Sequence, residues 1–239
     1  MLELISFFTR LPSNKLSLEK AAKQSFLLPV LGGLVGLIVG AFSLFAFKFI
    51  DRFLAALLTA VCLYFITGLN HLDGLSDFAD GLYTCGGSEK KIKVMKDTQT
   101  GVAGITFVLF VILFFIFAVF MLNGNIYKIL VAEVCAKTAM LFALFFGKSM
   151  KKGIGKLFIE GLNKSAVPFS ILFSLCLSFI LLRYLGLLAV LTSMFSSLII
   201  VKIAHRNFGA INGDVIGAIN ELSRVVSLLT LSIRILDRL

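Results

Sequence analysis

Residues 103–122 read AGITFVLFVILFFIFAVFML, an unbroken run without a charged side chain. Because an α-helix needs about 20 mostly apolar residues to cross a bilayer, this run predicts a transmembrane helix. Similar apolar segments lie at 26–47, 53–70, 126–147, 166–183 and 185–203. A seventh, 222–237, is weaker because Arg224 and Arg234 interrupt it. The sequence therefore predicts an all-α, polytopic membrane helix bundle with about six or seven transmembrane helices.

The composition of the chain supports the same class. Its 239 residues are 59% hydrophobic and 15% charged, with a mean hydropathy of +1.00. These values lie outside the usual range of soluble globular domains. The four cysteines are scattered, without the spacing of a zinc or redox site. No internal repeat or linker divides the chain, so residues 1–239 are expected to form one integral membrane domain.

Basic residues flank the apolar segments and give the chain a net charge of +10. This placement fits anionic lipid headgroups and predicts no nucleic-acid partner. Successive connections, beginning with the N-terminal segment that includes Lys15, contain four, two, four, one, five and one Lys or Arg. The alternation predicts a multi-pass protein of the cell membrane. Its cytoplasmic parts would be the N-terminus, 71–102, 148–165 and 204–221.

The fifth and sixth apolar segments are separated only by Arg183-Tyr184-Leu185-Gly186. So short a connection predicts a tight helical hairpin. In the first segment, Pro29 lies near the start, where a proline disrupts a helix least.

The residues most suited to chemistry follow the second apolar segment, in Asn70-His71-Leu72-Asp73-Gly74-Leu75-Ser76-Asp77-Phe78-Ala79-Asp80-Gly81. A helix would place Asp73, Asp77 and Asp80 on one stripe, because they are spaced i, i+4, i+7. Carboxylates this close repel each other, and a hard divalent cation such as Mg²⁺ would offset the repulsion. The alternative, a merely solvated helix end, is disfavoured because such faces usually mix both signs of charge.

A short basic helix is expected over 89–96, followed by a turn rich in hydroxyls and glycine at 97–101. Backbone N–H groups of that turn could hold a phosphate, and Lys96 and Asp97 adjoin it. The lysines could equally be interfacial anchors. Within the aspartate block, Gly74 and Gly81 weaken a continuous helix and suggest close approach of backbone to a ligand.

Two further places carry polar residues near or within apolar segments. Asn212-Gly213 predicts a turn with Asp214 as helix N-cap, and Glu221 falls on the same helix face as Asp214. Glu133 and Lys137 lie four residues apart in the fourth segment, where charges are functional candidates by default. They could neutralise each other or face a substrate, and both interpretations stay open.

At these motifs the chain resembles the cobalamin synthase family, polytopic enzymes of late corrinoid synthesis. The matching blocks are Phe7–Pro12, Leu28–Gly36, Thr67–Gly81, Val94–Gly101, Asn212–Ala218 and Glu221. They occur in the family's order and span nearly the whole chain. One departure is Lys137, where the family tends to carry Arg. Lysine cannot make a bidentate phosphate contact, so such a contact is not expected at this position.

The resemblance implies a catalytic domain that joins adenosylcobinamide-GDP to α-ribazole or its 5′-phosphate and releases GMP. Mg²⁺ would be held by Asp73, Asp77 and Asp80. The attacking hydroxyl would pass its proton to Asp97 or, with less support, to His71. A helix points His71 away from the aspartate stripe. The remaining residues implied in substrate binding are Arg10, Asn70, Lys96, Thr100, Lys137, Lys151, Lys152, Asp214 and Glu221. A homo-oligomer is compatible with the sequence.

Other membrane proteins remain as rival interpretations. Prenyltransferases and CDP-alcohol phosphotransferases also hold Mg²⁺–diphosphate with aspartates on membrane helices. The chain has only one prenyltransferase-like cluster, and it lacks the longer aspartate pattern of the second class. A cation-coupled transporter could use Glu133, Lys137 and Asp73 as a relay, but it would be expected to show repeat symmetry.

Overall fold

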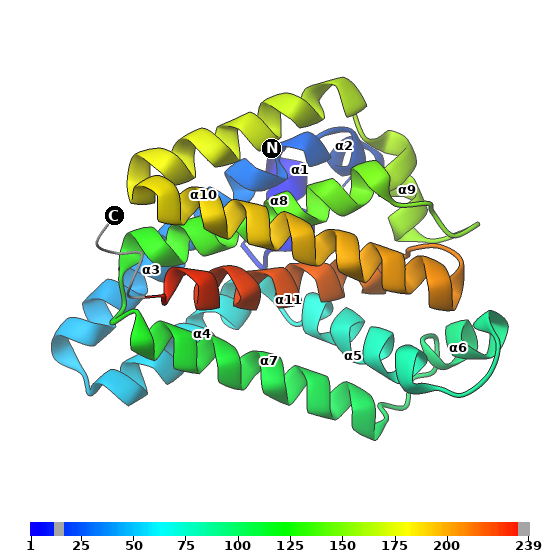
Figure 1. Ribbon diagram of the computed structural model, residues 1–239, viewed down its shortest axis with the longest axis horizontal. Helices are drawn as coiled ribbons and strands as arrows, with labels where there is room; N and C mark the ends of the chain where they lie inside the picture. The colour runs from blue at the N-terminus through cyan, green and yellow to red at the C-terminus, as the bar shows by residue number, and fades with distance from the viewer. Residues whose placement is uncertain (12–16, 234–239) are drawn as a thin grey trace.

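The computed structural model describes residues 1–11 and 17–233. Three residues named above lie outside the described residues: Pro12, Lys15 and Arg234. The end of the expected segment 222–237 lies outside them as well. The helices are α1 Leu2–Phe8, α2 Leu18–Lys23, α3 Leu28–Phe49, α4 Arg52–Thr67, α5 Asn70–Tyr83, α6 Ser88–Val94, α7 Val102–Met121, α8 Ile126–Phe146, α9 Ile154–Gly161, α10 Val167–Phe208 and α11 Gly213–Leu231 (Figure 1). Among the described residues there is no strand, only an isolated bridge between Ser149 and Ile211. The all-α prediction is confirmed.

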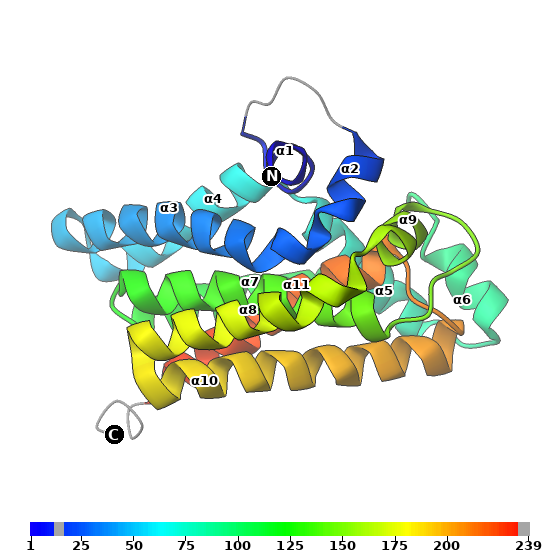
Figure 2. The ribbon, with the colours of Figure 1, turned by 90° about the horizontal axis from the view of Figure 1, so that it is seen from above.

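Helix α8 is the centre of the bundle, and α3, α10 and α11 pack around it (Figures 1 and 2). Close packing against α3 depends on Gly32, Gly36 and Gly40, which recur every fourth residue. A Cβ at Gly32 would lie 2.5 Å from the carbonyl oxygen of Glu133, and one at Gly36 would lie 2.7 Å from the Cα of Leu130. Small residues at this spacing let helix backbones approach closely, as in many membrane proteins.

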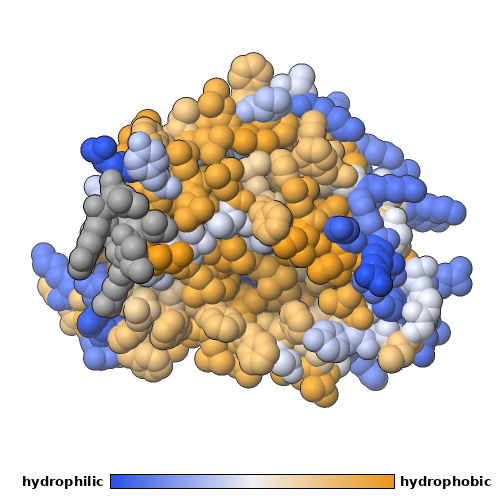
Figure 3. Space-filling model, in the orientation of Figure 1, coloured by the Kyte–Doolittle hydropathy of each residue, from blue (hydrophilic) through white to orange (hydrophobic). Residues whose placement is uncertain are grey.

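The outer surface of the bundle is apolar around its middle. Figure 3 shows a hydrophobic belt with hydrophilic atoms gathered towards both ends of the long axis. Among the described residues, four helical segments are long and apolar enough to cross a membrane, or five if α4 and α5 form one bent span. The four are Ser25–Phe49, Val102–Met121, Ile126–Phe146 and Lys164–Phe208. The predicted count of six or seven is not confirmed, because α4 has only 16 residues and α11 carries buried charges. In addition, the predicted segments 166–183 and 185–203 fall within one stretch, Lys164–Phe208.

The predicted hairpin is present within α10. Its helical course is interrupted at Arg183, where φ is 49° and ψ is −135°. Beyond this residue the chain doubles back, so that a Cβ at Gly186 would lie 2.1 Å from the carbonyl oxygen of Ser178. Figures 1 and 2 show the resulting two antiparallel arms.

A second break, between α4 and α5, positions the aspartate block. Gly68 has φ of 73°, and the two helices meet at an angle of 95°. From Asn70 onward α5 is a continuous helix, so Gly74 and Gly81 do not interrupt it. Both glycines are packing points instead: a Cβ would clash with the Asp214 backbone at Gly74 and with Met95 at Gly81.

Candidate active site

Carboxylates from two helices converge where α5 meets the first turn of α11. The stripe on α5 is present as predicted. A Cβ at Gly74 would lie 2.9 Å from the Cα of Asp214, so α11 begins in direct contact with this part of α5. Asp77 is repelled by Asp214, Asp73 and Asp80, with Asp214 the strongest of the three. The fold therefore adds a fourth carboxylate to the three predicted from local spacing.

Asp80 differs from the other carboxylates because its oxygens are already engaged. They accept hydrogen bonds from the backbone N–H groups of Gly101, at 2.7 Å, and Gly104, at 2.8 Å. Asp80 thus caps the start of α7, and a Cβ on either glycine would lie 2.5 Å from its carboxylate. The Gly101 N–H, which belongs to the turn predicted to hold a phosphate, is thus donated to this side chain. Asp80 is therefore held by the backbone of α7, whereas Asp73, Asp77 and Asp214 remain candidates for binding a ligand.

Asp214 is not the N-cap of α11, contrary to the prediction. The cap is Asn212, whose Oδ1 accepts from the backbone N of Val215 at 3.1 Å. The Nδ2 of Asn212 donates to Asp214 at 2.6 Å. Burial raises the pKa of Asp214 above its ordinary value. The hydrogen bond from Asn212 lowers this pKa, repulsion by Asp73 raises it further, and attraction to Lys96 lowers it. This environment favours a positive charge beside the carboxylate.

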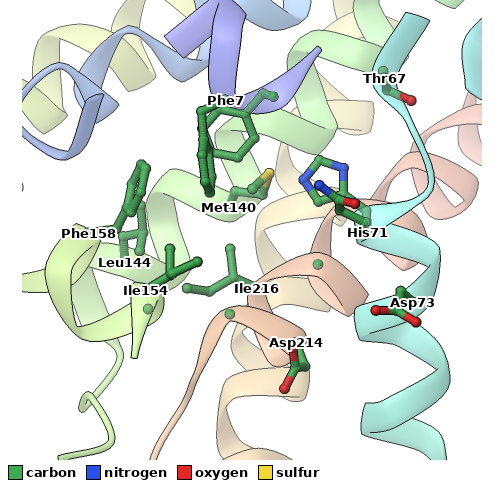
Figure 4. A pocket seen from close by; sticks show the side chains of 15 residues that line it. Phe7, Thr67, His71, Asp73, Met140, Leu144, Ile154, Phe158, Asp214 and Ile216 are labelled. Carbon is green, nitrogen blue, oxygen red and sulfur yellow. The ribbon is translucent and has the colours of Figure 1, made fainter. Parts of the chain in front are cut away.

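Two cavities meet at Asp214. The inner one has a volume of about 260 Å³ and the outer one about 800 Å³, and Ile154, Gly213 and Asp214 line both. The inner cavity has a polar wall on α5, formed by Asn70, His71 and Asp73. Figure 4 shows Asp73 and Asp214 near one end of this cavity, with Phe7 and Phe158 across from His71. A molecule bound in either cavity would therefore reach Asp214.

Lysines gather around the outer cavity, which we call the lysine basin. Its cations are Lys96, Lys148, Lys151 and Lys152, with Glu89 the acidic residue besides Asp214. The fold therefore brings together three of the four lysines predicted to contact substrate, namely Lys96, Lys151 and Lys152, from two separate connections. Lys148 was missed, although it follows directly on the fourth apolar segment.

Behind the inner cavity, charged residues of α8 and α11 form a buried network. Arg224 donates from Nε to Glu133 at 2.5 Å and from Nη1 to Glu221 at 2.5 Å. Lys137 donates to Oδ1 of Asn220 at 2.8 Å. Glu133, Lys137, Glu221 and Arg224 are each at most 1% exposed, and their formal charges sum to zero. Such a set can be buried because each ion keeps a partner.

Glu133 and Lys137 are therefore not a mutual pair. The partner of Glu133 is Arg224, and Lys137 faces Asn220 and lies 5.2 Å from the ring of Phe8. Sequence reasoning treated Arg224 only as an interruption of an apolar segment and overlooked Asn220. A signal was available, because Arg224 lies three residues after Glu221, which is the spacing of a helical ion pair.

Asn220 links the network to the inner cavity. Because a lysine ammonium can only donate, Oδ1 of Asn220 faces Lys137 and its Nδ2 is left to donate. That nitrogen lies 2.8 Å from Glu221 and 3.4 Å from Nδ1 of His71. Nδ1 of His71 is then the acceptor, and in the neutral ring Nε2 carries the proton.

Several predicted site residues do not line either cavity. Lys137 and Glu221 belong to the buried network. Asp97 is exposed and accepts from the backbone N of Gln99, and Thr100 is exposed before α7. Arg10 borders a separate groove of about 600 Å³ on the apolar surface between α4 and α7. In the described part of the chain, no three His, Cys, Asp or Glu side chains are close enough to hold a metal ion by themselves.

The apolar bundle and its carboxylate cluster between two cavities define the class, an integral membrane enzyme with a polar site at one end of a helix bundle. A comparison with known families matches residues 1–232 to cobalamin-5-phosphate synthase. The chain belongs to this family, as its resemblance at the motifs predicted.

Curated relatives agree with this assignment. Proteins named adenosylcobinamide-GDP ribazoletransferase are 38% identical in Pyrococcus furiosus, over 98% of this chain and 99% of the relative, and 34% identical in Methanocella arvoryzae, over 94% and 91%. A relative of the same name from Methanococcoides burtonii is 30% identical over 91% of this chain and 85% of its own length. No solved structure matches the chain.

Proposed function

We propose that the protein is an adenosylcobinamide-GDP ribazoletransferase that uses Mg²⁺. It would join adenosylcobinamide-GDP to α-ribazole or its 5′-phosphate and release GMP. A hydroxyl of the ribazole attacks the phosphorus on the cobinamide side of the diphosphate, and the bond to GMP breaks. The observation that carries this proposal is the convergence of Asp73 and Asp77 on Asp214, which lines both the inner cavity and the lysine basin.

The basic residues suit the donor diphosphate. Lys96, Lys151 and Lys152 border the lysine basin and can donate to phosphate oxygens. Phosphoryl transfer depends mainly on positioning and on neutralising charge, because the transition state spreads charge over the phosphoryl oxygens. From within the inner cavity, His71 can add one neutral N–H donor through Nε2.

Mg²⁺ fits the donor set. Asp73 and Asp77 are hard oxygen ligands that repel each other, and too few side chains converge to complete a metal shell. Substrate phosphate oxygens and water would take the remaining positions. Bound there, Mg²⁺ would neutralise charge on the diphosphate and on departing GMP. Asp80, the third predicted ligand, would act mainly by holding α5 to α7.

Asp214 is the carboxylate best placed to accept the proton of the attacking hydroxyl. It borders both cavities, so it can face an acceptor held in one and a donor held in the other. General bases must lie within hydrogen-bond reach of the proton they remove. Asp97 lines neither cavity. Because Nδ1 of His71 accepts the hydrogen bond from Asn220, its Nε2 carries a proton and would donate to the substrate instead of accepting a proton.

The test is turnover by purified protein in detergent. Adenosylcobinamide-GDP, α-ribazole 5′-phosphate and Mg²⁺ should yield GMP, and omission of any one should abolish its release. Asp73→Asn should lose this activity, whereas Asp51→Asn should keep it, because Asp51 only caps α4. Folded protein that releases no GMP under these conditions would contradict the proposal.

The same assay addresses the rival classes. Turnover without a sealed compartment excludes transport as the sole activity. Prenyl diphosphates or CDP-alcohols offered in place of adenosylcobinamide-GDP should give no product. Reaction with either would favour the corresponding transferase instead.

A further inference from the structure

The wall of the inner cavity opposite α5 is made of aromatic and aliphatic side chains. Phe7 of α1 and Phe158 of α9 lie with ring centroids 5.1 Å apart and planes tilted by 31°. Phe8 meets Phe158 edge-on at 5.8 Å and stacks on His71 at 5.8 Å. Met140, Leu144 and Ile216 extend this surface. The wall is suited to contact a planar, apolar group (Figure 4).

The two cavities differ in the size of the group they can hold. About 260 Å³ is below the usual range of pockets for drug-sized ligands, whereas about 800 Å³ lies within it. A corrin macrocycle with its substituents is too large for the inner cavity. One heteroaromatic base with part of its sugar is of a suitable size.

Chemistry then separates the two bases in the reaction. Guanine has several donors and acceptors on its edge, and the apolar wall contains no side-chain nitrogen or oxygen to pair with them. Burying a polar group without a hydrogen-bond partner is unfavourable. A benzimidazole-type base has a mostly hydrocarbon edge and avoids this cost.

We propose that the inner cavity is the acceptor subsite and takes the weakly polar, planar base of the ribazole against Phe7 and Phe158. This assignment rests on the proposed function. The sugar would lie towards Asn70 and Asp73, with its attacking hydroxyl near Asp214. The donor nucleotide occupies the lysine basin, so its diphosphate meets the hydroxyl at the junction of the cavities.

Steady-state kinetics with each substrate varied in turn tests the assignment. Phe158→Ala should raise KM for α-ribazole 5′-phosphate about tenfold or more, the scale of aromatic–base stacking, and leave KM for adenosylcobinamide-GDP unchanged. Because Phe158 is buried, Phe7→Leu provides a milder second variant that removes a half-buried ring. Phe117 on α7 is 56% exposed, and Phe117→Ala is the matched control that should change neither KM.

A selective rise in KM for adenosylcobinamide-GDP would place the donor in the inner cavity and overturn the proposal. Unchanged KM values in both variants would overturn it as well. Equilibrium dialysis with α-ribazole alone separates this result from failure of the proposed function. If GMP is not released but α-ribazole binds, and Phe158→Ala weakens that binding, the subsite assignment stands while the reaction is wrong.

Discussion

Among single residues, Asp80 shows that position on a stripe does not fix a role. Asp73, Asp77 and Asp80 occupy equivalent places on α5, yet Asp80 alone accepts two backbone N–H bonds from the start of α7. Removing such a cap typically costs about 0.5–2 kcal/mol. We therefore expect Asp80 to contribute to stability, whereas Asp73 and Asp77 contribute mainly to binding a cation.

The first prediction concerns Mg²⁺ and thermal unfolding in detergent. Mg²⁺ should raise the Tm of the wild type, since a ligand that binds only the folded state stabilises it. Asp77→Asn should lose most of that rise and, without Mg²⁺, be at least as stable as the wild type, because one repelling charge is gone. Its turnover should fall roughly a hundredfold or more.

Asp80→Ala serves as the contrasting variant for that prediction. It should lower Tm both with and without Mg²⁺ and keep part of the Mg²⁺-dependent rise. If Asp77→Asn and wild type respond identically to Mg²⁺, the metal assignment is wrong. If Asp80→Ala loses the whole response, Asp80 is a ligand as well as a cap.

Between elements, the site depends on how closely α5 and α11 approach. Gly74 faces the backbone of Asp214, and Gly217 faces the backbone of His71, where a Cβ would lie 3.2 Å from the Cα. These two contacts bring residues from distant parts of the chain to one place. The carboxylate cluster is therefore a property of a helix pair.

The second prediction is that Gly74→Ala separates this pair. Its methyl group would meet backbone atoms 2.9–3.0 Å away, which cannot swing aside as a side chain can. Overpacking of this kind typically costs about 1–3 kcal/mol. We expect a lower Tm and a turnover loss of about tenfold or more. Gly87→Ala, in open space on the N-terminal side of α6, should behave as the wild type.

The third prediction concerns the ion pair between α8 and α11. Glu133→Gln should destabilise the protein by about 3–5 kcal/mol, because Arg224 loses a partner while buried. Arg224→Met added to Glu133→Gln should recover part of that loss. Lys137→Met added to Glu133→Gln should give no such recovery.

Double-mutant cycles on folded yield and Tm measure these couplings. Strong coupling of Glu133 with Lys137, and none with Arg224, would contradict the pairing described here. Glu221 also pairs with Arg224, so recovery is expected to be partial.

Over the whole molecule, an apolar belt lies between polar ends, and the lysine basin belongs to one of them (Figure 3). Connections rich in Lys and Arg alternate along the chain with connections that have few. This alternation predicts that the end with the lysine basin faces the cytoplasm. The Arg183 turn of α10 then faces the opposite side. Both substrates would consequently reach the site from the cytoplasm.

The fourth prediction tests this orientation by cysteine labelling of intact cells. In a background without Cys62, Cys85, Cys135 and Cys176, a membrane-impermeant reagent should label Tyr184→Cys from outside. Ser88→Cys and Lys152→Cys should react only after the membrane is opened. The reverse pattern would invert the orientation, and a mixed pattern would mean that the two ends are assigned incorrectly.

Much of the architecture could be predicted because its causes are local. Hydropathy over about 20 residues identifies apolar helices, a four-residue connection predicts the α10 hairpin, and i, i+4 spacing predicts the stripe of Asp73 and Asp77. The family, too, is recognisable from blocks that are contiguous in the sequence. The number of spans was less predictable, because α4 is short and bent at Gly68, and α11 is buried despite its charges.

The sequence by itself thus determined the helical membrane class and the family, and it supplied the candidate residues for the chemistry. Only the tertiary structure decided which of them meet. Glu133 and Arg224 are far apart in the chain, and so are Asp77 and Asp214. The second pair comes together because Gly74 and Gly217 let α5 and α11 touch. Local periodicity describes the face of one helix, but it contains no information on which other helix will pack there.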